Sequence, residues 1–318
     1  MLVQPNSKLK DEILKLKKQK DVVILAHNYQ IPEIQDIADF TGDSLGLSRQ
    51  AAKVKQKTIL FCGVNFMAET AAIISPQKKV LLPDLEAGCS LSDSITVDEL
   101  KNWKKQYPDA IVVGYVNTTA EIKAELDYCC TSSNAVNVVS SISEEKDILF
   151  LPDMFLGAYV AKMTQRKNIR IWAGECHVHA GITATDVIEK LNSMNDTEFL
   201  IHPECSCTTP MMYDVADGSY SDQKISILST GGMLNHVKSS KTKNFVVATE
   251  TGILHQMKKQ NPDKTFIPAS EKAECQYMKM ITLEKVHDAL VNEKNVITVP
   301  KNIADKARLA INRMLAIS

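Results

Sequence analysis

The sequence contains no CxxC pair, although it holds eight cysteines among its 318 residues. Zinc ribbons and ferredoxin-like iron–sulfur domains normally bind their metal through such pairs, so a local site of either kind is excluded. A metal site in this chain would have to collect its cysteines from distant parts of the sequence.

Signals for export, for membrane insertion and for polyanion binding are missing as well. The N-terminal segment lacks the apolar core and small-residue cleavage site of a secretion signal, and no apolar run approaches the roughly 18 residues that span a bilayer. The formal net charge of -1, from 37 basic and 38 acidic residues, indicates neither nucleic acid nor an anionic membrane as a partner. We therefore expect a cytoplasmic protein that acts on small molecules, with reduced thiols and no disulfide framework.

Short apolar runs rich in β-branched residues alternate with helical stretches along most of the chain. Such runs are typical of buried parallel strands, and helical connections between them indicate βαβ units and an α/β fold. The predicted strands lie within residues 22–27, 58–66, 79–85, 110–117, 147–153, 170–175, 198–204, 224–230, 244–250 and 265–269.

One order of motifs recurs three times. Each copy opens with a strand that ends in polar residues (AHNY, GYVNT, IHPEC) and continues with a hydroxyl residue before a helix (GDSL, CTSSNA, STGG). An acidic residue then follows a strand (FMAE, LPD, VATE), and each copy ends at a cysteine: Cys89, Cys176 and Cys275.

The repeats predict three similar parallel-sheet α/β domains, namely residues 1–104 with an N-terminal helix, residues 105–192, and residues 193–318 with a C-terminal helix. In such sheets, ligands bind beyond the carboxyl ends of the strands, where the polar ends of the repeats lie. A pseudo-threefold arrangement of the domains would point these ends at one central active-site cavity. The three cysteines would then meet there.

Three thiolates suit a 4Fe–4S cluster that leaves one iron open, and an open iron can act as a Lewis acid toward a substrate hydroxyl or carboxylate. A single cysteine is more often a small buried hydrophobe, so it is the threefold recurrence that favours ligation. The cysteines that do not recur are interpreted as buried hydrophobes: Cys62, Cys129, Cys130, Cys205 and Cys207. The last two lie close to the predicted site, and the sequence leaves their role open.

Polar residues at the ends of the opening strands are candidates for catalysis. They are His27 and Tyr29, Tyr115 and Asn117, and His202 and Glu204. A lone histidine at a strand end is usually a structural hydrogen-bonding residue, but here such side chains occupy equivalent positions of three repeats. Glu204 and His202 can form an acid–base pair. His179 can reach the same cavity, whereas His177 would point elsewhere in an extended segment.

Ser44, Ser132 and Thr230 each stand where the chain enters a helix. Each is expected to cap its helix, which contributes about 1 kcal/mol. A helix N-terminus also offers free N–H groups to anions, so three converging helix starts would suit a substrate rich in carboxylate or phosphate.

The stretches AHNYQ, GDSL, FMAE, DLEAGCS, GYVNT, CTSSNA, CHVH, HPEC and ATETGIL resemble the signature stretches of the quinolinate synthase family, in family order from residue 22 to about residue 280. The resemblance implies a transferase that condenses iminoaspartate with dihydroxyacetone phosphate to quinolinate, phosphate and water in NAD biosynthesis. It also implies three α/β domains around an oxygen-sensitive 4Fe–4S cluster with three cysteine ligands. An enzyme that supplies iminoaspartate is a conceivable partner.

The resemblance also implies roles for individual residues. By position, the cluster ligands would be Cys89, Cys176 and Cys275. The substrate site would be lined by His27, Ser44, Tyr115, Val116, Asn117, Ser132, His202, Pro203, Glu204 and Thr230, to which the sequence pattern adds His179. Tyr29 and Glu204 match the proton-transfer residues of the family. Together with the strand-end argument, this gives the catalytic set Tyr29, Tyr115, His202 and Glu204.

The chain departs from the family pattern in two places. Residues 206–228 form a longer segment than usual, so Ser219 or Ser229 could replace Thr230 as the substrate contact. Some relatives carry further cysteines beside the third ligand, but the stretch CQYM that starts at Cys275 has none, so no regulatory disulfide is predicted there.

Other classes of protein remain open from the residues alone. An iron–sulfur hydro-lyase of another family would share the open cluster but handle a single hydroxy acid. A non-catalytic iron–sulfur sensor would not need His202, Glu204, Tyr29 and Tyr115 at repeated strand ends, and it would usually carry a nucleic-acid surface. A structural zinc protein would use three cysteines and a histidine.

Overall fold

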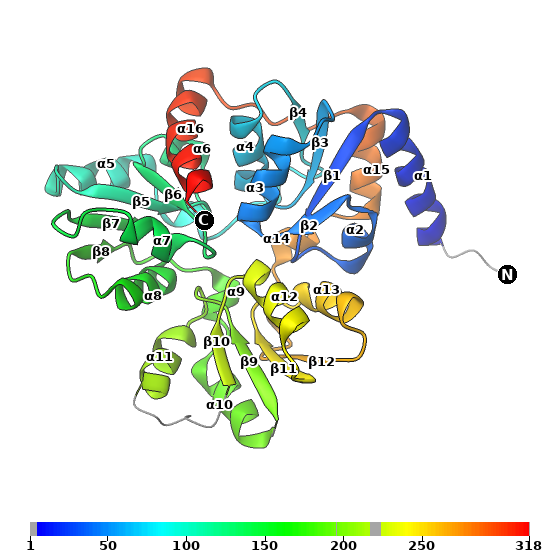
Figure 1. Ribbon diagram of the computed structural model, residues 1–318. Coiled ribbons are helices and arrows are strands. Elements are labelled where there is room, and N and C mark those ends of the chain that lie inside the picture. The colour runs from blue at the N-terminus through cyan, green and yellow to red at the C-terminus, as the bar shows by residue number, and fades with distance from the viewer. Residues whose placement is uncertain (1–4, 195, 217–223, 318) are drawn as a thin grey trace.

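The computed structural model describes residues 5–194, 196–216 and 224–317. Within these ranges the strands form three four-stranded sheets, each with its second strand at one edge, followed by the first, the third and the fourth. Neighbouring strands are parallel throughout, and Figure 1 shows each sheet with its own helices. The predicted α/β class with three similar domains is confirmed, while the pseudo-threefold arrangement remains a prediction.

The first sheet has the order β2-β1-β3-β4. Its strands are β1 (Val22–His27), β2 (Phe40–Gly42), β3 (Thr58–Cys62) and β4 (Lys79–Leu81). Its helices are α1 (Pro5–Gln19), α2 (Pro32–Ile37), α3 (Ser44–Lys53) and α4 (Asn65–Ile74), and the 3-10 turn η1 (Ser92–Ser94) follows.

The continuous apolar run of β1 arises because helices cover both faces of the sheet. Alternate side chains of a strand point to opposite faces. Val23 and Leu25 pack with the residues of α3 and α4, whereas Ile24 packs with Ile13 of α1 and Ile34 of α2. All six residues of the strand are buried.

The second sheet has the order β6-β5-β7-β8. Its strands are β5 (Ile111–Tyr115), β6 (Tyr128–Cys130), β7 (Ile148–Leu151) and β8 (Ile169–Ile171). Its helices are α5 (Val97–Gln106), α6 (Ala120–Lys123), α7 (Ala135–Ser140) and α8 (Met154–Thr164), and α9 (His177–Ala180) and α10 (Ala184–Ser193) lead to the third sheet.

The third sheet has the order β10-β9-β11-β12. Its strands are β9 (Thr197–Ile201), β10 (Lys224–Ile227), β11 (Asn244–Ala248) and β12 (Thr265–Pro268), and its helices are α11 (Thr208–Ala216), α12 (Thr230–Ser239) and α13 (Ile253–Gln260). As in the first sheet, neighbouring residues of the central strand β9 face opposite sides: Leu200 packs in one apolar cluster and Phe199 in another.

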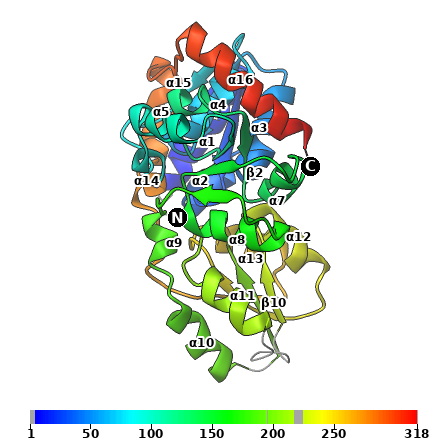
Figure 2. The same ribbon diagram turned by 90° about the vertical axis from the view of Figure 1, so that its left-hand side faces the viewer.

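The last three helices return toward the first two sheets. They are α14 (Gln276–Lys279), α15 (Leu283–Asn292) and α16 (Lys301–Ala316). Helix α15 packs against α1 and β3, and α16 packs against α4, α6 and β6. Figures 1 and 2 both show α16 far from the third sheet. The predicted domain boundaries remain a prediction, and this packing joins the C-terminal segment of residues 193–318 to its neighbours.

Membrane insertion finds no support in the helices. In the described part of the chain, none of them is both long enough and apolar enough to cross a bilayer.

Candidate active site

One cavity lies where the carboxyl ends of strands from all three sheets meet. It encloses about 700 Å³ of empty space, counting the solvent at its mouth, which is in the range of small-molecule sites. The predicted site residues that line it are His27, Tyr29, Ser44, Cys89, Tyr115, Asn117, Ser132, Cys176, His179, His202, Glu204, Thr230 and Cys275. Val116 and Pro203 are buried but are not among the described residues that line this cavity.

Each of the three recurring cysteines stands just before a short helical turn. Cys176 and Cys275 are the N-cap residues of α9 and α14, and Cys89 stands three residues before η1. Burial raises the pKa of each thiol, to about 12 for Cys89, but two backbone N–H groups oppose this effect at each sulfur. These N–H groups belong to the second and third residues after each cysteine: Leu91 and Ser92, Val178 and His179, Tyr277 and Met278.

This environment fits three ligands of an iron–sulfur cluster. N–H donors stabilise a thiolate and tune cluster sulfurs, and a metal keeps a coordinating thiol deprotonated despite its burial. In contrast, burial raises the pKa of Cys62, Cys129 and Cys130, and no N–H group of the described residues opposes this effect at these sulfurs. The donor set therefore separates the recurring cysteines from the buried apolar ones.

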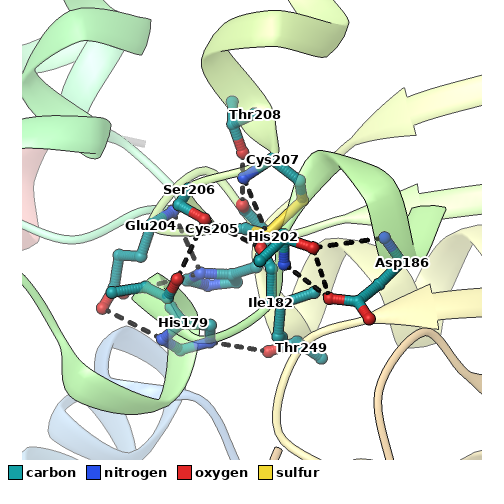
Figure 3. Close-up of a disulfide and its surroundings, with 12 residues drawn as sticks. His179, Ile182, Asp186, His202, Glu204, Cys205, Ser206, Cys207, Thr208 and Thr249 are labelled. Carbon is teal, nitrogen blue, oxygen red and sulfur yellow. Dashed lines mark hydrogen bonds and ion pairs between the residues drawn. A yellow bond between two sulfur atoms is a disulfide. The ribbon is translucent and has the colours of Figure 1, made fainter. Parts of the chain in front are cut away.

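Cys205 and Cys207 belong to the apolar core of the third unit, as their interpretation as buried hydrophobes predicted, but they form a disulfide bond, so the expectation that all thiols stay reduced was wrong. Both residues are fully buried beside the site. Figure 3 shows the bond next to His202, with Glu204 and His179 close by.

Glu204 lies at the centre of the polar side chains. The Tyr115 hydroxyl donates a hydrogen bond to its Oε1. The Nδ1 atoms of His179 and His202 each lie 3.6 Å from a carboxylate oxygen of Glu204. Burial raises the pKa of Glu204 to about 7, although the hydrogen bond from Tyr115 opposes the shift. The carboxyl group can therefore both accept and release a proton near neutral pH.

Three of the histidines that line the cavity, His27, His179 and His202, are held in the neutral form. Burial lowers the pKa of His27 and of His179 to about 3, and it lowers that of His202 well below its ordinary value. The rings of His179 and His202 are stacked with centroids 4.8 Å apart. Neutral imidazoles offer one donor and one acceptor nitrogen each, which suits proton transfer.

The Tyr29 hydroxyl lies within hydrogen-bond distance of Thr249 and of one ring nitrogen of His179. The hydroxyl lies 2.6 Å from Thr249 Oγ1 and 3.3 Å from His179 Nε2, and Thr249 Oγ1 lies 2.9 Å from the same nitrogen. The other ring nitrogen of His179 faces Glu204, as Figure 3 shows. Burial and the charge of Glu204 raise the pKa of both Tyr29 and Tyr115, so the phenols stay protonated.

His177 was expected to point away from the cavity only in an extended segment, and that condition is not met. Its segment is not extended but forms the one-turn helix α9, which turns His177 toward the cavity that it lines. There its Nδ1 lies 2.7 Å from Ser90 Oγ, and its ring meets the edge of Tyr277.

The hydroxyl residues Ser44, Ser132 and Thr230 line the cavity, but none of them caps its helix, so that expectation was wrong. The N-caps of α3, α7 and α12 are Asp43, Asn134 and Ser229. Thr230 lines the cavity and accepts a hydrogen bond from Asn28. Ser229 and Ser219 were the alternatives to Thr230 as the substrate contact. The Ser229 side chain caps α12, and Ser219 lies outside the described residues.

Several cavity residues had no predicted role, among them Asp43, Ser90, His177, Glu250 and Tyr277. Glu250 stands in VATE, one of the recurring acidic motifs, so the sequence carried a signal for it. The others follow from loop and helix geometry that the pattern does not encode.

Comparison with known proteins agrees with the sequence motifs. A family model described as "Quinolinate synthetase A protein" matches residues 11–316. A quinolinate synthase from Thermus thermophilus is 51% identical over 309 residues, covering 97% of this chain and 97% of the relative. One from Mycobacterium sp. strain KMS is 49% identical over 315 residues, covering 99% and 94%, and one from Mycobacterium tuberculosis H37Rv is 50% identical over 306 residues, covering 96% and 88%.

A solved structure of the E-1-hydroxy-2-methyl-but-2-enyl-4-diphosphate reductase from Plasmodium falciparum covers 91% of this chain and 94% of its own, with 10% identity and a TM-score of 0.35. Similarity at that level is too low to bear on the fold or the chemistry.

Proposed function

Because the chain belongs to the quinolinate synthase family, we propose that it condenses iminoaspartate with dihydroxyacetone phosphate to quinolinate, phosphate and water, as a cytoplasmic transferase of NAD biosynthesis. The observation that carries this proposal is the cavity itself. It is lined by one recurring cysteine from each of the three α/β units and by Glu204, whose pKa burial raises to about 7.

In this proposal Cys89, Cys176 and Cys275 hold a 4Fe–4S cluster with one open iron. The three sulfurs with their paired N–H donors suit that role. When bound, the cluster supplies Lewis-acid chemistry for a substrate hydroxyl or carboxylate.

The protein side chains supply the proton transfers. Enolisation and loss of water need a base and an acid close to the substrate carbons. Glu204 serves as the base in its ionised form, and Tyr29, whose hydroxyl lies within hydrogen-bond distance of Thr249 and His179, serves as the acid. Tyr115 donates to Glu204 and holds its carboxylate in place.

The charged ends of the substrates are matched by groups at the cavity wall. Iminoaspartate and dihydroxyacetone phosphate together carry two carboxylates and a phosphate. The N-termini of α3 and α12 reach the cavity at Ser44 and Thr230, and they offer N–H groups and hydroxyls to anions. The Asn117 Oδ1 atom is buried and has no hydrogen-bond partner in the described part of the chain, so it is available to a substrate donor.

An anaerobic assay tests the proposal. Chain reconstituted with iron and sulfide should form quinolinate from the two substrates, and metal-free chain should form none. Turnover of a single hydroxy acid instead would indicate the hydro-lyase, and a cluster without turnover would indicate the sensor.

Metal analysis tests the remaining alternative, a structural zinc protein. Cys176, His179 and Glu204 present ligand atoms within 4.8 Å of one another, a set that zinc also accepts. Protein isolated without oxygen should contain iron and inorganic sulfide, and zinc in their place would contradict the proposed cofactor.

A further inference from the structure

We propose that the ion pair of Glu250 and Lys279 is a positioning device that fixes the third cluster ligand, Cys275, relative to the catalytic strand end at Tyr29. The inference rests on the proposed function, because it takes Cys275 to be a ligand. Neither Glu250 nor Lys279 is a catalytic residue in this account.

Glu250 receives donors from three directions. Its side chain has no exposure to solvent and follows strand β11. Oε1 accepts from the Cys275 N–H at 3.1 Å and lies 2.6 Å from Lys279 Nζ, while Oε2 accepts from the Gly252 N–H at 2.7 Å. The carboxylate therefore holds the backbone of the ligand residue itself.

Lys279 extends this contact to the first α/β unit. It is the last residue of α14, one turn after Cys275, whose carbonyl oxygen accepts from the Lys279 N–H at 3.1 Å. Its Nζ also donates to the Tyr29 carbonyl oxygen at 2.7 Å. One ammonium group thus joins the carboxylate that holds Cys275 to the main chain of Tyr29.

The surrounding backbone leaves little room for either side to shift. A Cβ atom on Gly252 would lie 2.8 Å from both the carbonyl carbon and the oxygen of Tyr29. Gln35 Nε2 donates to the carbonyl oxygens of Gly252, Gln30 and Asn28 at 2.9, 2.7 and 3.1 Å. A displacement at Cys275 would therefore be passed on to Tyr29.

A buried ion pair is weak evidence for stability by itself, because desolvation offsets much of the attraction. This ion pair lies between the proposed metal ligand Cys275 and the proton-transfer residue Tyr29. Residues that contact a metal ligand in this way orient the ligand in many metal sites. Replacing such partners typically costs about 10- to 100-fold in metal affinity or activity.

Glu250→Gln is the principal test variant. In the wild type, three donors share the two carboxylate oxygens of Glu250. Glutamine keeps the shape of the side chain but has only one acceptor oxygen. We expect its reconstituted cluster to be lost to a chelator about 10-fold faster than in the wild type, with a changed electron paramagnetic resonance spectrum after reduction. Lys279→Met should keep wild-type iron and sulfide but lower kcat with little change in KM, and Lys279→Arg should restore part of the loss.

Glu198→Gln is the matched control. Glu198 is another buried carboxylate of the third unit, which accepts from Ser240 and Thr242 and contacts His236 away from the cavity. We expect the Glu198→Gln variant to have a lower free energy of unfolding than the wild type, but to lose its cluster to the chelator at the wild-type rate. A wild-type rate and spectrum in Glu250→Gln, or equally fast loss in Glu198→Gln, would overturn the inference.

Hydrogen exchange separates this inference from the proposed function. In metal-free protein, the Cys275 amide should exchange faster in Glu250→Gln than in the wild type, whether or not the chain makes quinolinate. An unchanged exchange rate at that amide would overturn the positioning role even if the wild type is fully active.

Discussion

Glu204 shows how one residue acquires its chemistry from burial. Its carboxyl group is surrounded by neutral imidazoles and protonated phenols, none of which supplies a positive charge to stabilise the ionised form. Burial therefore dominates and raises its pKa to about 7. Its position in HPEC at a strand end could be predicted from the repeats. Its pKa could not, because burial depends on residues from all three units.

Replacing Glu204 by glutamine should leave the cluster in place and remove turnover. The amide keeps the shape and can still accept from Tyr115, but it cannot take up a proton. We expect quinolinate formation to fall by at least about 100-fold, the lower end of the usual contribution of a general base. Wild-type iron and sulfide contents would serve as the control, and unchanged turnover in the anaerobic assay would remove Glu204 from the mechanism.

Cysteine substitutions should separate ligands from buried hydrophobes. Cys176→Ala removes one of three proposed anchors, so we expect no stable cluster after anaerobic reconstitution. Cys62→Ala removes a fully buried thiol that has no N–H donor, so the cluster should form normally. The iron and sulfide contents of the two reconstituted variants measure cluster formation. Equal contents in Cys176→Ala and Cys62→Ala would contradict the assignment of Cys176 as a ligand.

At the scale of elements, the sequence predicts the strongly apolar strands well and misses two edge strands. Residues 22–27 are predicted and observed as β1, and the three-residue edge strands β4 and β8 overlap predicted segments, whereas β2 and β6 have no predicted counterpart. The sequences of β2 (FTG) and β6 (YCC) contain no valine, isoleucine or leucine, so they lack the apolar pattern of the other strands. Helix starts were misplaced by one residue at α3 and α12 because Asp43 and Ser229 can cap as well as the hydroxyl residues that follow them.

Two N-caps should have different consequences when removed. Thr96 caps α5 in a reciprocal pair with Glu99, and neither residue lines the cavity, so Thr96→Ala should lower the free energy of unfolding by about 1 kcal/mol and leave turnover unchanged. Asp43 caps α3, lines the cavity and accepts from Ser133, so Asp43→Ala should lower both stability and turnover. Denaturant unfolding and the quinolinate assay measure the two effects. Equal turnover in the two variants would show that the cap at the cavity matters only for stability.

At the scale of the whole molecule, the sequence predicts three units but not how they are joined. The repeats place a cysteine in each unit, and that is enough to expect a shared cavity. The return of α15 to α1 and the packing of α16 across α4 and β6 have no counterpart in the repeats. Such contacts depend on complementary surfaces of distant elements, which an apolar pattern in a single sequence does not identify.

An ion-pair group between the first and third units should make stability depend on pH in a defined window. Asp36 of α2 lies 2.9 Å from His255 Nε2 and 2.7 Å from Lys259 Nζ, both on α13. Burial alone would raise the pKa of Asp36, but the hydrogen bonds from Lys259 and His255 outweigh it and lower the value to about 2. An unfolded aspartate titrates near pH 3.9.

Because the folded pKa is the lower one, the contribution of Asp36 to stability is present above about pH 4 and is lost as the pH falls toward 2. Asp36→Asn should therefore be less stable than the wild type at pH 6, and the difference should shrink in acid and in high salt, since the pair is partly exposed. Denaturant unfolding of both proteins at pH 6 and pH 3 measures this. A difference that stays constant with pH would mean that the carboxylate charge does not hold these two units together.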